Sequence, residues 1–313
     1  MASSHRWLAL APGDVVDVVA PGFRSSAEEL VGGERFLRDW GLRPRIPKDI
    51  YGRDVLCANS DEVRFEQLKK ALYAPDSKAI WCIRGGYGAN RLLPGLMRLK
   101  RPKGRPKLLV GLSDITSLHV FLNQQWGWPT VHGPLLDRLG RKAALPKYER
   151  ELKRFVFGGE DEIIFSGLRA MNTPAKKKTV LRAEVSGGNL VVLQSSLATN
   201  CQWQTAGKIL FFEEIGERGY RVDRMLEHFT QVGLFKRAKA IVFGQFIGGR
   251  EPDGSNHVWP VIERFAKDSR IPVLKGLASG HDVIQRPLPF GTRAELHLGG
   301  STARLVCASG GEA

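Results

Sequence analysis

The first half of the chain alternates short apolar runs with segments of helical periodicity. The runs at 14–22, 79–88 and 108–112 predict buried strands, and each contains or leads into glycine. Helical spacing of apolar residues covers 60–76 and 115–127. Strands that alternate with helices predict a parallel or mixed sheet with helices on its faces.

A further helix is predicted over 25–41 by its start and stop signals. Ser25 or Ser26 is suited to cap its first turn, and the acidic pair Glu28 and Glu29 follows. Gly41 is placed to end it.

The pattern changes after residue 136. We expect an N-terminal α/β domain over 1–150, a linker or inter-domain crossing over 151–178, and a second domain over 179–313. The last segment, "AELHLGGSTARLVC", predicts a β-hairpin.

Composition and charge narrow the function. The 313 residues have a normal globular composition and a formal net charge of +15, which favours nucleic acid or a carboxylate-rich substrate as partner. The basic residues are dispersed, apart from runs at 98–107 and 176–178, and no aromatic residues interleave those runs. No nucleic-acid motif accompanies them, so we expect no nucleic-acid partner.

We also expect no membrane span, metal or cofactor. No apolar run approaches the roughly 20 residues that a membrane helix needs, and Asp14 and Asp17 interrupt the N-terminal apolar stretch, so a cytoplasmic protein is predicted. Four cysteines stand far apart without a CxxC pair, which disfavours a disulfide framework or a zinc site.

Ser113 lies in "VGLSDITSLH", between a predicted strand and a predicted helix. A nucleophile at such a corner is exposed at the sheet rim and has helix N-terminal amides nearby for an oxyanion. The second glycine of the G-x-S-x-G elbow is missing, which argues against an ordinary α/β-hydrolase. A helix cap by Ser113 or Asp114 is the alternative.

The glycine loop "RGGYG", residues 84–88, lies after another predicted strand. It is an oxyanion loop or a tight turn that needs positive φ, and Tyr87 either lines a pocket or packs. Because ligands bind at the carboxyl ends of parallel strands, we expect the loops 85–88 and 111–114 to share one rim.

Three histidines bear on the chemistry. His119 lies six residues after Ser113 on the same predicted helix and faces away from it, so a core or surface role is expected. His132 ends a predicted strand and is a rim candidate. His281 follows a small-residue turn and is suited to act as a base toward a nucleophile.

Carboxylates follow the buried run in "FFEEIGE". Glu213, Glu214 or Glu217 could orient a catalytic histidine, or each could be a solvated or arginine-paired acid.

Together these segments resemble the LD-carboxypeptidase family of serine peptidases, the muramoyl-tetrapeptide carboxypeptidases. The resemblance covers about residues 12 to 298 and rests on motifs in the family's order, which are "RGGYGANRLLPGL", "VGLSDITSLH", "TVHGPLL", "SGGNLVVLQSSLATN", "ILFFEEIGERGYRVDRMLEHF", "IVFGQF" and "GHDVIQRPLPFG". It implies two domains, an N-terminal Rossmann-like α/β sandwich and a C-terminal β-rich α+β domain, with the site at their interface.

The resemblance also implies a Ser-His-Glu triad. Ser113 takes the serine position, Glu213 the acid position and His281 the histidine position. It implies hydrolysis of the L,D-peptide bond that releases D-alanine from murein tetrapeptides, no cofactor, a homodimer and a role in peptidoglycan recycling.

Substrate groups are assigned on the same basis. The amides of Asp114, Gly86 and Tyr87 are expected to bind the oxyanion. Arg84, with Arg91 and Arg221 as alternatives, is expected to hold a substrate carboxylate, unless these arginines form structural ion pairs.

Two other functions remain open. Glu214 stands where the family has Asp, and "SSLATN" replaces a Gly-Thr, which affects the substrate more than the chemistry. One alternative is an immunity peptidase that cleaves microcin C-type peptidyl-nucleotide conjugates. The other is a non-catalytic murein-ligand-binding protein, against which the set Ser113, Glu213 and His281 argues.

Overall fold

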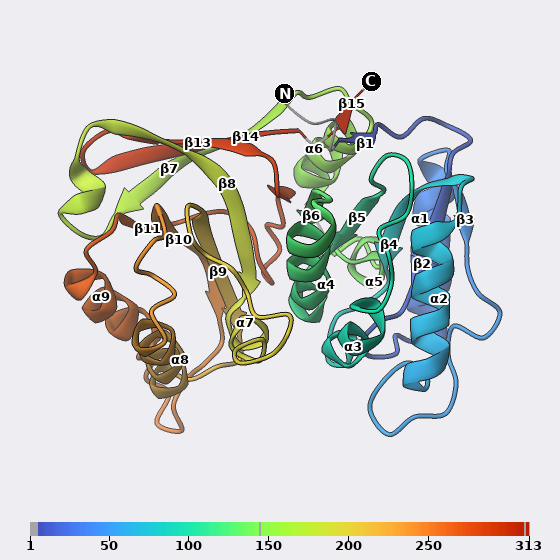
Figure 1. Cartoon of the computed structure of the whole chain (residues 1–313), viewed down its shortest axis with the longest axis horizontal. Helices are drawn as coiled ribbons and strands as arrows, with labels where there is room; N and C mark the ends of the chain where they lie inside the picture. Colours follow the sequence, from blue (N-terminus) through green and yellow to red (C-terminus); the bar gives the residue numbers. More distant parts are fainter. Residues whose placement is uncertain (1–5, 144, 310, 313) are drawn as a thin grey trace. The chain divides into compact units, whose positions relative to one another are not determined.

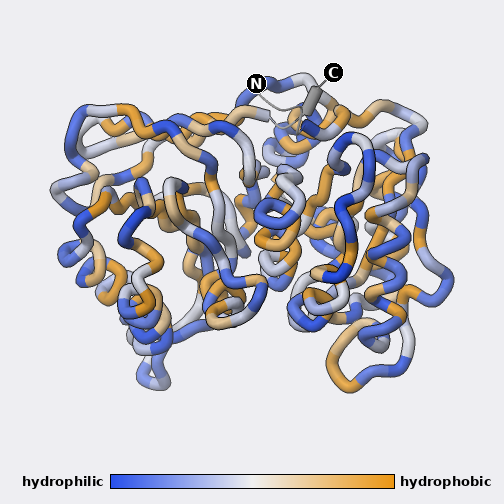
Figure 2. Tube along the Cα trace, in the orientation of Figure 1, coloured by the Kyte–Doolittle hydropathy of each residue, from blue (hydrophilic) through white to orange (hydrophobic). Residues whose placement is uncertain are grey.

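The computed structural model describes residues 6–143, 145–309 and 311–312, in two compact units. The first unit runs to Asp161 and regains Gln285–Phe290 and the C-terminal end from Ser309. The second comprises Glu162–Ile284 and Gly291–Ala308. In Figure 2 hydrophobic residues concentrate in strands and helices, whereas the connecting loops are mostly hydrophilic.

A parallel sheet with one antiparallel edge strand forms the first unit. Within the described residues its order is β12-β6-β5-β4-β2-β3, and β12 is the antiparallel strand. The strands are β2 (Val15–Val19), β3 (Arg43–Arg45), β4 (Ser77–Cys82), β5 (Leu108–Gly111), β6 (Thr130–His132) and β12 (Leu288–Phe290). A short parallel pair, β1 (Trp7–Leu8) and β15 (Gly311–Glu312), joins the two ends of the chain.

Helices cover the sheet in two groups (Figure 1). One contains α1 (Ala27–Asp39) and α5 (Leu136–Gly140); the other contains α2 (Asp61–Tyr73), α3 (Leu93–Leu96) and α4 (Thr116–Phe121). The remaining helical segments are α6 (Pro146–Val156), η1 (Ala89–Leu92), η2 (Ser113–Ile115) and η3 (Leu122–Trp126). Because both faces are covered, the central strands β4 and β5 are almost entirely buried.

The predicted start of α1 is confirmed. Ser26 is the cap: its side chain accepts from the Glu29 amide at 3.2 Å, and the Glu29 carboxylate accepts from the Ser26 amide at 2.9 Å. This reciprocal pair satisfies two amides that the helix leaves unbonded.

Seven strands close into a barrel in the described part of the second unit. The order is β10-β11-β7-β14-β13-β8-β9. The strands are β7 (Glu162–Ala170), β8 (Thr179–Asn189), β9 (Ile209–Ile215), β10 (Ala240–Ile247), β11 (Val273–Lys275), β13 (Arg293–Leu298) and β14 (Thr302–Ala308). Its helical segments are α7 (Leu190–Gln194), α8 (Gly219–Gln231), α9 (Val258–Asp268) and η4 (Pro174–Lys176). The expected hairpin is confirmed as β13 and β14.

The predicted fold class, an α/β chain with a β-rich C-terminal domain, is confirmed, but the expected linker over 151–178 differs from the structure. That segment holds the end of α6, the barrel strand β7 and η4, and the chain leaves the first unit at Asp161. The second domain, expected over 179–313, is also interrupted in sequence, because β12 pairs with β6 and so belongs to the first unit. No helix in the described ranges has both the length and the apolar composition to cross a membrane.

Candidate active site

Ser113 lies at the corner between β5 and η2 with a left-handed backbone. Its φ is +68°, and only two other described non-glycine residues, Lys142 and Ala198, have positive φ. Such a conformation costs about 1–3 kcal/mol and persists only where the surroundings enforce it. Its side chain is partly exposed. This strained strand-to-helix turn has the geometry of a nucleophile elbow.

Two glycines make room for this corner. A Cβ on Gly85 would lie 2.7 Å from the Ser113 Cβ and 3.1 Å from its Oγ. A Cβ on Gly111 would lie 2.9 Å from both Cγ atoms of Ile115. The elbow therefore tolerates Ile115 where the usual motif has a second glycine, because Gly111 leaves space for it.

The helix-cap alternative is not supported. Within the described residues, neither η2 nor α4 begins with a side-chain capping bond. The buried Asp114 carboxylate instead accepts a hydrogen bond from the Ala89 amide at 2.7 Å. Burial raises the pKa of Asp114 to about 6, although the amides of Ala89 and Gly88 lower it.

The glycine loop and Ser113 share one rim, as predicted, and Phe23 helps to hold the loop there. The Phe23 amide donates to the Gly85 carbonyl at 2.8 Å. Gly86 and Gly88 have φ of +92° and +128°, so the tight-turn geometry is present. No hydrogen bond in the described chain engages the amides of Gly86 and Tyr87, which leaves both as donors for a ligand.

The three arginines expected at the substrate carboxylate each have an acidic neighbour. Arg84 lies 3.5 Å from the Glu29 carboxylate, and Arg221 lies 3.4 Å from Glu217. Arg91 binds both carboxylate oxygens of Asp61 through its Nε at 2.9 Å. These side chains remain substantially exposed, so a role for Arg84 in substrate binding stays a prediction.

Glu213 and His281, 68 residues apart in the chain, meet in the second unit. His281 Nδ1 lies 2.6 Å from Oε2 of Glu213, whose side chain is fully buried on β9. A carboxylate that accepts from Nδ1–H fixes the tautomer in which Nε2 carries the lone pair. This is the arrangement of a histidine prepared to accept a proton.

Gln245 holds the loop that carries His281, and sequence reasoning missed it. Its Oε1 accepts from the Asp282 amide and its Nε2 donates to the Ile284 carbonyl, both at 2.9 Å. A Cβ on Gly280, where φ is +140°, would lie 2.9 Å from the same Oε1. The motif "IVFGQF" contains Gln245 and could have drawn attention to it. Its hydrogen-bond partners, Asp282 and Ile284, are identified only by the fold.

Glu214 has a different role from its neighbour Glu213. Its carboxylate accepts from the Asn189 side chain at 2.8 Å and from the amides of Ile215 and Val191 at 2.8 and 2.9 Å. Burial, followed by the charge of Glu213, raises the pKa of Glu214 to about 7. It ties β9 to β8 and α7.

His119 and His132 are core residues. His119 bonds the Gly111 carbonyl through Nε2 and Thr130 through Nδ1, each at 2.9 Å, and burial lowers its pKa to about 3. His132 ends β6, as predicted, but it is fully buried there, because β12 pairs with β6 and the ring centroids of Phe290 and His132 lie 5.6 Å apart.

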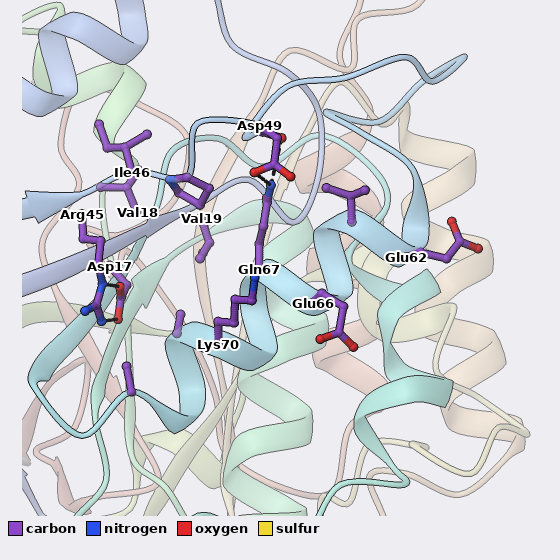
Figure 3. Close-up of a pocket in the computed structure, with 14 residues that line it drawn as sticks. Asp17, Val18, Val19, Arg45, Ile46, Asp49, Glu62, Glu66, Gln67 and Lys70 are labelled. Atoms are coloured by element: carbon purple, nitrogen blue, oxygen red, sulfur yellow. Dashed lines mark hydrogen bonds and ion pairs between the residues drawn. The ribbon is translucent and has the colours of Figure 1, made fainter.

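A cavity of about 640 Å³ lies elsewhere in the first unit, between β2, β3 and α2 (Figure 3). Arg45 and Asp17 pair at 2.6 Å beside it, and Gln67 donates to the Asp49 carbonyl at 2.8 Å. None of the predicted site residues is among its described lining residues.

Comparison with known proteins decides the family. The LD-carboxypeptidase N-terminal domain model matches residues 16–133, and the LD-carboxypeptidase C-terminal domain model matches residues 182–296. The chain belongs to the LD-carboxypeptidase family. This carboxypeptidase therefore has Ser113 inside the first match, and Glu213 and His281 inside the second.

Relatives of this carboxypeptidase match over most of their length. A putative carboxypeptidase of Rickettsia conorii is 36% identical over 82% of this chain and 80% of its own. The crystal structure of a muramoyltetrapeptide carboxypeptidase from Oxalobacter formigenes is 26% identical, with a TM-score of 0.80 over 94% of this chain and 98% of that one. An MccF-like protein from Bacillus anthracis shares the fold at 21% identity, with a TM-score of 0.82 over 96% and 98%.

Proposed function

We propose that this carboxypeptidase hydrolyses the L,D-peptide bond that releases terminal D-alanine from murein tetrapeptides, through Ser113, His281 and Glu213. The observation that carries the proposal is the 2.6 Å contact between His281 Nδ1 and buried Glu213, because it makes Nε2 the basic nitrogen. The strained corner at Ser113 supports the choice of nucleophile.

The first half of the reaction forms an ester. Ser113 Oγ bonds to the carbonyl carbon on the L side of the scissile bond while His281 Nε2 takes the hydroxyl proton. The amides of Gly86, Tyr87 and Asp114 donate to the oxyanion, and one such donor is worth roughly 3 kcal/mol. The C–N bond then breaks, and His281 gives its proton to the amine of the departing D-alanine.

The second half restores the enzyme. Water attacks the ester carbonyl as His281 takes one of its protons, and the proton returns to Ser113 Oγ as the ester bond breaks. Glu213 holds the imidazole in position and stabilises its cation in both halves.

The substrate assignment rests on the Oxalobacter formigenes relative, whose name gives muramoyltetrapeptide as its substrate. The net charge of +15 suits a muropeptide, which carries several carboxylates, and Arg84 is proposed to hold one of them. The likeness to the MccF-like protein is one of fold, so cleavage of a peptidyl-nucleotide conjugate is the less supported alternative.

The test is incubation with anhydromuramoyl tetrapeptide followed by mass spectrometry. We expect loss of one alanine that disappears in Ser113→Ala and persists in Ser117→Ala, a matched control on α4. Unchanged tetrapeptide with cleavage of a microcin C-type conjugate would overturn the substrate assignment. Activity that survives Ser113→Ala would remove the nucleophile.

The family resemblance also suggests a pathway, a cellular location and an oligomeric state. We place the enzyme in peptidoglycan recycling in the cytoplasm, as a homodimer. Light scattering of the purified protein tests the dimer: a mass near 34.7 kDa would contradict it, since that is the mass of one chain.

A further inference from the structure

A single peptide bond in the glycine loop is held from both sides by buried charged residues. Arg64 Nη1 donates to the Gly88 carbonyl at 3.0 Å, and the Asp114 carboxylate accepts from the Ala89 amide at 2.7 Å. This carbonyl and this amide belong to the same peptide unit. Arg64 is 1% exposed and Asp114 is 3% exposed, so water does not compete strongly for either contact.

Arg64 also joins the surrounding loops to this peptide. Its guanidinium donates to the carbonyls of Pro21 and, at 3.0 Å, Asn59, and it pairs with Asp61 at 2.5 Å. These bonds offset the cost of burying the charge. One side chain of α2 thus connects the segment after β2, the start of its own helix and the glycine loop after β4.

The Asp114 side chain connects the same loop to the serine corner. Asp114 follows Ser113 directly, and its carboxylate accepts a hydrogen bond from the Ala89 amide at the end of the loop. The other end of the loop lies against the serine, because a Cβ on Gly85 would stand 2.7 Å from Ser113 Cβ. A Cβ on Gly22 would lie 2.9 Å from the Asp114 carboxylate, so this contact also needs a glycine beside it.

Glycines give the loop many accessible conformations, and the clamped peptide removes most of them. Gly86 and Gly88 both have φ values that other residues rarely adopt. When the Gly88–Ala89 peptide is fixed, the backbone of the two preceding residues, Gly86 and Tyr87, has fewer orientations open to it. The amides of these two residues are the ones proposed to donate to the oxyanion.

We propose that Arg64 and Asp114 act as a pair of positioning residues that set the Gly86 and Tyr87 amides relative to Ser113. The inference rests on the proposed function, and it assigns the Asp114 side chain a role separate from that of its backbone amide. Neither side chain touches the reacting atoms. A loop misplaced by about 1 Å costs on the order of 100-fold in rate, whereas affinity for the rest of the substrate is retained.

The test uses Asp114→Asn and Arg64→Lys in the full chain. We expect kcat to fall roughly 10- to 100-fold with KM changed less than about 3-fold. The matched control is Asp17→Asn. Asp17, labelled in Figure 3, is a buried carboxylate of the same unit that accepts hydrogen bonds from Ser77 and Arg45. The control should lower the melting temperature and leave kcat unchanged.

A second measurement is independent of the peptide substrate. An organophosphonate that labels the serine places its P–O oxygen where the oxyanion forms, so its labelling rate, followed by intact mass, should fall in both variants. The proposed role of Arg64 and Asp114 would be overturned if Asp114→Asn and Arg64→Lys kept the wild-type kcat and labelling rate while their melting temperatures fell as much as that of Asp17→Asn. If Ser113→Ala retains tetrapeptide cleavage, the proposed function fails instead, whatever the results for Asp114→Asn and Arg64→Lys. Should Arg64→Lys not fold, Asp114→Asn alone decides.

Discussion

Gly85 lies so close to Ser113 that a side chain on the glycine would meet the serine itself. A Cβ added to Gly85 would lie 2.7 Å from Ser113 Cβ and 3.1 Å from the Leu112 carbonyl oxygen. Two chain segments from the ends of β4 and β5 therefore fit together only when one of them has no side chain. The proposed nucleophile and its proposed oxyanion loop depend on this contact.

Gly85→Ala should abolish most of the activity while the chain still folds. The new methyl must displace either Ser113 or the glycine loop, and we expect kcat to fall at least 100-fold. Gly159→Ala is the control, because its Cβ would meet the Arg154 carbonyl at an ordinary 3.4 Å. Equal kcat values for the two variants would contradict the tight fit.

Glu213→Gln tests the orientation of His281. The glutamine amide can donate to Nδ1 and so move the imidazole proton to Nε2, which removes the base. We expect kcat to fall roughly 10³- to 10⁴-fold. Glu214→Gln is the comparison variant. The Glu214 carboxylate accepts hydrogen bonds from the Asn189 side chain and from two backbone amides, so its loss should change the melting temperature more than kcat. A glutamine at 213 that retains activity would exclude the triad.

The sequence was informative where local pattern determines structure. Ser26 and Glu29 satisfy each other three residues apart, and β13 and β14 pair across a short turn, so both were predictable. The three proposed catalytic residues were found through their motifs, whereas the contact between His281 and Glu213 depends on how the barrel brings their segments together.

Other features gave no local signal. Arg64 looks like any charged residue of a helix that carries as many acidic as basic side chains, and its most distant partner, the Pro21 carbonyl, lies 43 residues away in the chain. Strand β7 was hidden because Gly167, with φ of +75°, interrupts the alternation of buried and exposed positions, and the register of its pairing with β14 shifts nearby. The return of 288–290 to the first sheet depends on pairing with β6, far away in sequence.

Ser113→Gly should stabilise the protein relative to Ser113→Ala while both lack activity. Glycine adopts positive φ without the steric cost that alanine keeps, so the expected gain is about 1 kcal/mol. At Ser117, inside α4, the order should reverse, because glycine is about 1 kcal/mol worse than alanine in a helix. Melting temperatures of the four variants decide; the same order at both positions would mean that Ser113 is not strained.

The buried Glu214 contributes stability that is lost as pH rises through neutrality. Its pKa is raised from 4.5 to about 7 in the folded chain, so the folded state binds the proton more tightly. The stabilisation is full below the unfolded value and is lost as pH rises through about 7. Asp114, raised to about 6, acts in the same direction at slightly lower pH.

Between pH 5.5 and 7.5 His119 opposes this slope, because burial lowers its pKa from 6.5 to about 3 and the unfolded chain loses the proton of this histidine in that range. The Glu214→Gln variant keeps His119, so a comparison of the two proteins cancels this contribution. The pKa of Asp61 is lowered, chiefly by its bond to Arg91, and that of Lys107 is lowered to about 8 by burial, so they act mainly below and above this range. We therefore expect the stability of the wild type relative to Glu214→Gln to be greater at pH 5.5 than at pH 7.5, by on the order of 1 kcal/mol. Melting curves of both proteins at the two pH values measure this difference, and parallel behaviour would show that Glu214 titrates alike in the folded and unfolded chain.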